Sequence, residues 1–175
     1  MEELPKISQF LQRVMIPVIF VLGSLMFLVV IAQVIARYVF SYPLAWSEEL
    51  ARYLMVWLAC LAASEAYAKG HHVGVTLILH ALKPALRKIM ILFTHLAVAV
   101  VMGVITYQGV KLSYLLRNQV SPAMEVPMTW PYLAVPVGAG VMLIQALAFF
   151  FKQVGEPAPE IEIHSELDEL EESEK

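Results

Sequence analysis

Long uninterrupted apolar runs dominate the pattern of hydrophobic and polar positions along the chain. Three of them, residues 14–36, 89–110 and 130–151, contain 23, 22 and 22 residues without a charged side chain. A helix needs about 20 predominantly apolar residues to cross the ~30 Å hydrocarbon core of a bilayer. The sequence therefore predicts a membrane-spanning helix in each of these three runs.

A fourth run, residues 53–64, is shorter, with only 12 uncharged residues, which make about 18 Å of helix. Charged residues border it on both sides: Glu48, Glu49 and Arg52 before it, and Glu65 and Lys69 after it. A run of this length is also typical of a buried soluble helix or a re-entrant segment. Because no helix breaker occurs between residues 44 and 69, we expect one continuous helix and interpret residues 47–68 as a fourth span with charged ends.

The predicted fold class is an all-α integral membrane protein with four transmembrane helices and short interfacial helices. Residues 1–13 form an N-terminal interfacial segment, because apolar residues recur there at helical spacing. Residues 14–152 form the four-helix membrane domain. Residues 153–175 form an acidic cytoplasmic tail, which we expect to be disordered because it contains few apolar residues. The predicted spans lie at about 14–36, 47–68, 89–110 and 130–151.

Composition supports the membrane assignment and excludes other classes. Hydrophobic residues make up 59% of the chain and charged residues 15%, against about 45–50% and about 25% in soluble domains. Residues 1–155 carry a net charge of +5 and residues 156–175 a net charge of −8. The basic part is too apolar for nucleic-acid binding, which requires clustered surface lysines and arginines. The single Cys60 excludes an intrachain disulfide and a cysteine-based zinc cluster.

Basic residues near the helix ends predict that both termini are cytoplasmic. With the N-terminus inside, seven lysines and arginines lie on the cytoplasmic side and four on the outer side, the acidic tail excepted. This bias follows the positive-inside rule.

Residues for catalysis are lacking, so we expect no enzyme activity and no cofactor. The sequence contains no nucleophile–base–acid set, no glycine-rich phosphate loop and no cluster of metal ligands. One alternative is a haem-binding membrane anchor of a redox enzyme, although His95 has no histidine partner at its own depth. Another is a small autonomous carrier, although the ionisable residues lie at the span ends rather than at the midplane. An accessory subunit of a larger assembly is the better interpretation.

Pairs of small residues four positions apart indicate close helix packing. They are Ala59/Ala63, Ala62/Ala66 and Ala134/Gly138. Such pairs let helix backbones approach closely in lipid, either within one subunit or between two.

The stretch from Arg37 to Val75 contains the most informative polar residues. Glu48 lies four positions and Glu49 three positions before Arg52, which is the favourable order for ion pairs along a helix. An exposed pair of this kind contributes less than about 1 kcal/mol and does not by itself indicate a function. Because the charges lie beside an aromatic cluster at the outer membrane surface, we interpret them as a polar cluster that faces a partner.

The sequence resembles the small, DctQ-like membrane subunit of tripartite ATP-independent periplasmic (TRAP) transporters over about residues 10–152. The matching elements are Arg37–Phe40, Trp46–Arg52, His72–Val75, Pro122–Met128 and Tyr132–Gly138. The Trp-x-Glu-Glu-hydrophobic-Ala-Arg element is the most specific of these. Where relatives often carry Asp after the His-hydrophobic-x-Val element, this chain has Thr76, so no role of that Asp is transferred.

The resemblance implies a small permease subunit of the bacterial cell inner membrane that carries no substrate itself. Such a subunit scaffolds and anchors a large sodium-coupled membrane subunit, which takes up an organic acid such as a dicarboxylate or sialic acid. A periplasmic binding protein delivers the acid. On this basis the residues expected to contact a partner are Arg37, Trp46, Glu48, Glu49, Arg52 and His72. No residue is expected to bind substrate or metal.

Overall fold

The computed structural model of the chain describes residues 3–69 and 84–155, and these residues are helical apart from their connections. The elements are α1 (Glu3–Tyr38), α2 (Ala45–Ala68), α4 (Pro84–Leu115), the 3₁₀ turn η1 (Leu116–Asn118), α5 (Thr129–Tyr132) and α6 (Ala134–Gly155). The all-α prediction is confirmed. His72 and the tail beyond residue 155 lie outside the described residues.

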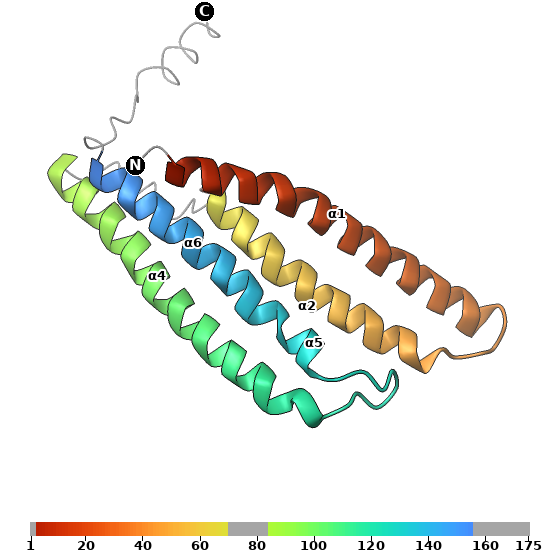
Figure 1. Cartoon of the computed structure of the whole chain (residues 1–175). Coiled ribbons are helices and arrows are strands. Elements are labelled where there is room, and N and C mark those ends of the chain that lie inside the picture. The colour runs from red at the N-terminus through yellow and green to blue at the C-terminus, as the bar shows by residue number, and fades with distance from the viewer. Residues whose placement is uncertain (1–2, 70–83, 156–175) are drawn as a thin grey trace, which may run out of the picture.

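The four long helices lie side by side, with α2 and α6 between α1 and α4 (Figure 1). α6 packs against α4 and α2, and α1 packs mainly against α2. The starts of α1 and α4 lie at the same end of the bundle as the ends of α2 and α6 (Figure 1). The two described connections, residues 39–44 and 119–128, therefore lie together at the other end, which we call the connection end.

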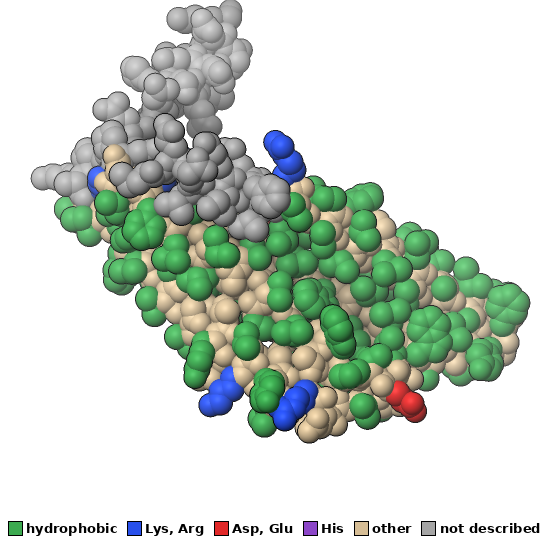
Figure 2. Space-filling view, in the orientation of Figure 1, with side chains coloured by type: hydrophobic (Ala, Val, Ile, Leu, Met, Phe, Trp, Pro, Cys, Tyr) green, Lys and Arg blue, Asp and Glu red, His purple; other side chains and the backbone are tan. Residues whose placement is uncertain are grey.

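Three of the described helical segments are long and apolar enough to cross a membrane. They are Arg13–Tyr38, Leu86–Asn118 and Thr129–Gly155. Each contains one of the long apolar runs. Helix α2 has the extent expected for residues 47–68 but does not join this group, because charged residues at both of its ends shorten its apolar centre. The face in Figure 2 is mostly apolar, and its described charged side chains lie toward the ends of the bundle.

Two details of the helices differ from a simple run-by-run assignment. Residues 3–13, expected as an interfacial segment, belong to the same continuous helix as the first predicted span. The last predicted span consists of α5 and α6, which meet at Leu133. Pro136 has no backbone N–H to donate to the carbonyl of Tyr132, so one hydrogen bond of the helical ladder is missing there.

α2 and α6 approach each other closely at Gly138. A Cβ atom added at Gly138 would lie 2.8 Å from both the carbonyl oxygen and Cβ of Cys60. Ala134, the other member of the Ala134/Gly138 pair, is fully buried. This pair therefore packs inside the subunit, where its lack of side-chain bulk brings the two central helices together.

We predict that Gly138→Ala destabilises the bundle, because the added methyl group overlaps the backbone of α2. Overpacking of this kind costs about 1–3 kcal/mol of the free energy of unfolding. The measurement is thermal denaturation of the full chain in detergent. Gly103→Ala in α4 is the matched control, since a Cβ there has no neighbour within 4 Å. A melting temperature of Gly138→Ala at or above that of Gly103→Ala would contradict the packing.

Candidate functional site

The connection between α1 and α2 is a short, closed turn. The N–H of Tyr42 donates to the carbonyl of Ala36 at 3.0 Å, and the N–H of Val39 donates to Ile35 at 2.9 Å. Ser41 adopts a φ of 50°, the left-handed conformation that commonly ends helices. The chain thereby reverses direction within residues 39–44, so α2 starts beside the end of α1.

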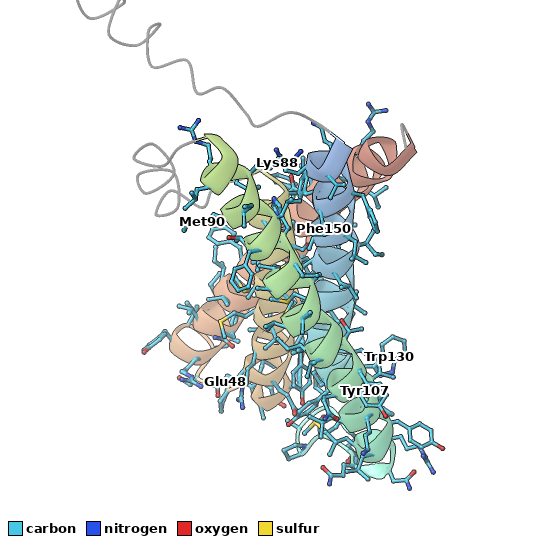
Figure 3. All side chains as sticks on the ribbon, turned by 90° about the vertical axis from the view of Figure 1, so that its left-hand side faces the viewer. Glu48, Lys88, Met90, Tyr107, Trp130 and Phe150 are labelled. Carbon is cyan, nitrogen blue, oxygen red and sulfur yellow. The ribbon has the colours of Figure 1, made fainter. Side chains whose placement is uncertain are left out.

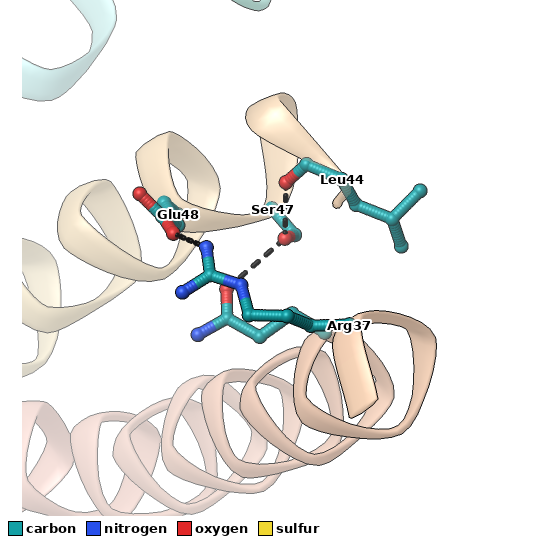
Figure 4. Close-up of polar contacts among 5 residues, drawn as sticks. Arg37, Leu44, Ser47 and Glu48 are labelled. Carbon is teal, nitrogen blue, oxygen red and sulfur yellow. Dashed lines mark hydrogen bonds and ion pairs between the residues drawn. The ribbon is translucent and has the colours of Figure 1, made fainter. Parts of the chain in front are cut away.

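Arg37 and Glu48 form an ion pair across this turn (Figure 4). Their side chains are 54% and 49% exposed, so the pair lies at the surface. Beneath it, the buried Oγ of Ser47 lies 3.0 Å from Oε1 of Gln33 and 2.7 Å from the carbonyl of Leu44. The ion pair and the serine together fix the first turn of α2 to the last turns of α1.

The carboxylate of Glu49 points in the opposite direction, into the protein. Its Oε2 accepts hydrogen bonds from the backbone N–H groups of Ala123 and Met124, both at 3.0 Å, and Oε1 accepts one from the hydroxyl of Tyr53. Only 7% of Glu49 is exposed. Hydrogen bonds to a charged group are about twice as strong as neutral ones. Glu49 therefore anchors the connection between α4 and α5 to the start of α2.

The anchored segment, residues 119–128, is itself a closed loop. The N–H of Met128 donates to the backbone carbonyl of Gln119 at 2.8 Å, and the N–H of Ser121 donates to the backbone carbonyl of Val126 at 2.9 Å. Glu125 has a φ of 55°, which turns the chain at the tip. The N–H groups of Ala123 and Met124 point out of this turn and need an external acceptor, which Glu49 provides.

Arg52 takes no part in either interaction. It is exposed, and within residues 3–69 and 84–155 no acidic side chain forms an ion pair with it. The pairing of Glu49 with Arg52 suggested by helical spacing is thus replaced by the contact of Glu49 with the loop. No sequence pattern indicates this contact, because its partners are backbone groups more than 70 positions away.

The exposed residues of α2 form one continuous stripe along the helix. Its members recur every three or four positions and so share a helical face: Glu48, Arg52, Met55, Ala59, Ala63 and Ala66. We call this surface the α2 stripe. It is charged at the connection end and consists mainly of small side chains further along. Of the expected partner residues, Trp46 is also exposed at this end, whereas Glu49 is covered by the loop.

Figure 3 places Glu48, Trp130 and Tyr107 toward the connection end and Lys88 and Phe150 toward the opposite end. The Nε1–H of Trp57 in α2 donates to the carbonyl of Trp130 at 3.2 Å, which adds a second link between α2 and the start of α5. Several charged and aromatic side chains thus surround the two connections.

His95, the candidate haem ligand, is engaged in packing. Its Nδ1 lies 2.7 Å from the hydroxyl of Tyr67, and its ring centroid lies 5.7 Å from that of Phe149. It is the only histidine among the described residues, so no facing pair of imidazoles occurs in the part of the chain that the structure describes.

Comparison with known families gives one match that covers most of the chain. Residues 26–156 match the family described as "Tripartite ATP-independent periplasmic transporters, DctQ component".

Individual relatives come from different bacteria. The C4-dicarboxylate TRAP transporter small permease protein DctQ of Rhodobacter capsulatus is 34% identical over 117 residues, which cover 65% of this chain and 52% of the relative. The sialic acid TRAP transporter permease protein SiaT of Haemophilus influenzae is 31% identical over 75% of this chain and 22% of its own length. The isethionate TRAP transporter permease protein DctMQ of Oleidesulfovibrio alaskensis is 27% identical over 70% of this chain and 20% of its own length. The chain thus spans about half the length of the first of these three relatives and about a fifth of the other two.

We predict that Glu49→Ala releases the loop, because two N–H groups and the Tyr53 hydroxyl lose their acceptor. Loss of hydrogen bonds to a charged group costs about 1.5–3 kcal/mol, so amide hydrogen exchange at residues 120–126 should accelerate about 10- to 100-fold. Glu49→Gln retains one acceptor oxygen and should show a smaller effect. Glu48→Ala, which removes only the ion pair with Arg37, is the control. Unchanged exchange in Glu49→Ala would contradict the anchoring role.

Proposed function

The chain belongs to the DctQ component family of tripartite ATP-independent periplasmic transporters, and we propose that it scaffolds and anchors a large sodium-coupled membrane subunit. It is a multi-pass membrane protein of a transporter permease family and not an enzyme. A periplasmic binding protein completes the proposed assembly and delivers an organic acid. The haem-anchor alternative is set aside, because the family match covers most of the chain.

The observation that carries the proposal is the α2 stripe. α1 and α6 cover the flanks of α2, but this face stays open. Small residues allow a neighbouring helix to approach closely, and the charged group at the connection end gives the contact a polar complement. A face of this composition suits a protein neighbour better than lipid, since Arg52 has no acidic partner among the described residues.

The names and lengths of relatives support a larger partner. The isethionate relative is named a permease protein DctMQ, and this chain corresponds to only 20% of it. A segment like this chain therefore forms one part of a longer permease in that protein. We infer that this chain likewise works with a large membrane subunit. The relatives are named for C4-dicarboxylate, sialic acid and isethionate, all organic acids, so the proposed substrate class is an organic acid.

We further propose that α2 is a fourth membrane span. A helix of 24 residues is about 36 Å long, which is enough to cross the hydrocarbon core. Because α2 lies between α1 and α6, most of its surface contacts protein. Its charged ends, at Glu48 and Lys69, then lie at the two membrane surfaces.

The partner contacts proposed for Arg37, Trp46, Glu48 and Arg52 are direct, since these side chains are exposed. Glu49 acts on the same surface from inside, by fixing the loop beside it. His72 remains a proposed contact, as it lies outside the described residues.

The proposed location is the bacterial inner membrane with both termini in the cytoplasm, and reporter fusions test this orientation. Fusions at Ser41 and Gln119, in the two described connections, should report the periplasm. Fusions at Gly74 and Glu160 should report the cytoplasm. A cytoplasmic signal at Ser41 would reverse the orientation, and equal signals at Ser41 and Gly74 would exclude α2 as a span.

We predict that Arg52→Glu abolishes assembly while the subunit itself still folds and inserts. Arg52 forms no ion pair with the described residues, so its reversal breaks none of them. Co-purification with the large subunit should fall at least about tenfold, as expected when a charged interface contact is reversed. Uptake of the organic acid by proteoliposomes should fall in parallel.

Lys111→Glu is the matched control, since Lys111 is an exposed basic residue on α4, away from the α2 stripe. Membrane insertion and thermal stability of both variants should equal those of the wild type. Wild-type uptake by a complex that carries Arg52→Ala would refute the assignment of Arg52 to the interface.

A further inference from the structure

A pocket of about 340 Å³ lies between α1 and α2, near the end of α2. Its residues are Ile19 from α1 and Ala62, Glu65, Ala66 and Lys69 from α2. The volume lies within the range of about 300–1,000 Å³ that is typical of small-ligand sites. Three of its residues are apolar and two are charged, so the pocket combines an apolar wall with one carboxylate and one ammonium group.

The carboxylate of Glu65 lacks sufficient partners inside the protein. Only 6% of the residue is exposed, and neither carboxylate oxygen accepts a hydrogen bond. Nζ of Lys69 lies 3.4 Å from Oε1, which is an ion pair without hydrogen-bond geometry. Within residues 3–69 and 84–155, no cation forms an ion pair with Oε2. Burial of a carboxylate is costly unless a cation and hydrogen-bond donors compensate for the lost water. Among the described residues, Glu65 therefore has Lys69 as an ion-pair partner but no hydrogen-bond donor.

The position of the pocket indicates which cation is available. Lys69 directly follows the last residue of α2, so the pocket lies at the end of the helix. With α2 as the proposed fourth span, this end lies near the depth of lipid headgroups. Ile19 belongs to the segment Arg13–Tyr38, which is long and apolar enough to cross the membrane. A phospholipid can thus reach the pocket from the side, with its headgroup near the two charges and its acyl chains along α1.

We propose that this pocket binds the headgroup of a phospholipid that carries a primary amine, of the ethanolamine type. The ammonium group brings three N–H donors to the carboxylate of Glu65. Lys69, whose side chain is 49% exposed, turns its flexible ammonium group to the lipid phosphate. The apolar surface of Ile19, Ala62 and Ala66 contacts the glycerol and the first methylenes. A choline headgroup has no N–H donor, and a glycerol headgroup has no cation, so neither satisfies Glu65.

A basic side chain of a neighbouring subunit is the competing occupant, because it too would bring a cation to Glu65. The headgroup depth of the pocket and the abundance of lipid there favour the lipid. This inference rests on the proposed fourth span but not on the proposed large subunit, and its lipid-binding test requires only the full chain.

The test measures the lipids retained by the full chain after purification in a mild detergent. Extracted lipids are quantified by mass spectrometry, and thermal stability is recorded during titration with ethanolamine, choline or glycerol phospholipid. We expect the wild type to retain the ethanolamine lipid selectively and to be stabilised by that lipid alone. In Glu65→Gln, retention should fall about tenfold, the loss expected for one charge-assisted contact. Lys69→Met should also weaken retention. Glu125→Gln, which removes an exposed acid at the connection end, should retain as much lipid as the wild type.

Two results would overturn the proposal. One is equal retention of the ethanolamine lipid by the wild type and Glu65→Gln, or equal stabilisation by all three lipids. The other is absence of bound lipid from the wild type together with loss of large-subunit co-purification in Glu65→Gln, which would assign the pocket to a basic side chain of the partner. Neither result would affect the charged end of the α2 stripe at Glu48 and Arg52, because Ala66 is the one residue that the stripe shares with the pocket.

Discussion

The buried carboxylate of Glu49 connects α2 to the segment that joins α4 to α5. A charge at this depth is tolerated because two backbone N–H groups and the Tyr53 hydroxyl surround it. The same contact satisfies two backbone groups that the tight loop leaves without partners. Helix α2 and the loop therefore stabilise each other, and this contact holds the loop in place at the connection end.

This arrangement explains how a helix with a short apolar centre lies inside a bundle of more apolar helices. α1 and α6 cover the flanks of α2, and the absence of a side chain at Gly138 lets α6 approach the backbone at Cys60. Its acids are accommodated individually: Glu48 pairs with Arg37, Glu49 contacts the loop, and Glu65 faces the pocket. The α2 stripe is what remains open, and its composition suits a protein neighbour.

The apolar runs predicted the long helices well, because a run of about 20 apolar residues has few alternatives in a membrane protein. The motif around Trp46–Arg52 also located the polar cluster and the family. The direction in which each charged side chain points could not be predicted from the sequence. Helical spacing predicted that Arg52 would pair with Glu48 or Glu49. In the structure, Glu48 pairs with Arg37, and Glu49 accepts hydrogen bonds from backbone groups of a distant loop. From the sequence, Glu65 was interpreted only as a charge at the end of a span. Its pocket could not be predicted, since it forms between two helices and has no sequence motif.

The central place of α6 has a consequence for biosynthesis. α6 contacts α1, α2 and α4 but is the last of these helices to leave the ribosome. Until then, one flank of α2 has no protein neighbour, and the backbone at Cys60 lacks the close contact with Gly138. The tight turn at residues 39–44 compensates in part, since it holds α2 against α1 from the moment both are made. The first two helices thus pair as a hairpin before the C-terminal part of the chain is made, and the subunit acquires its final packing only after translation of the last helix.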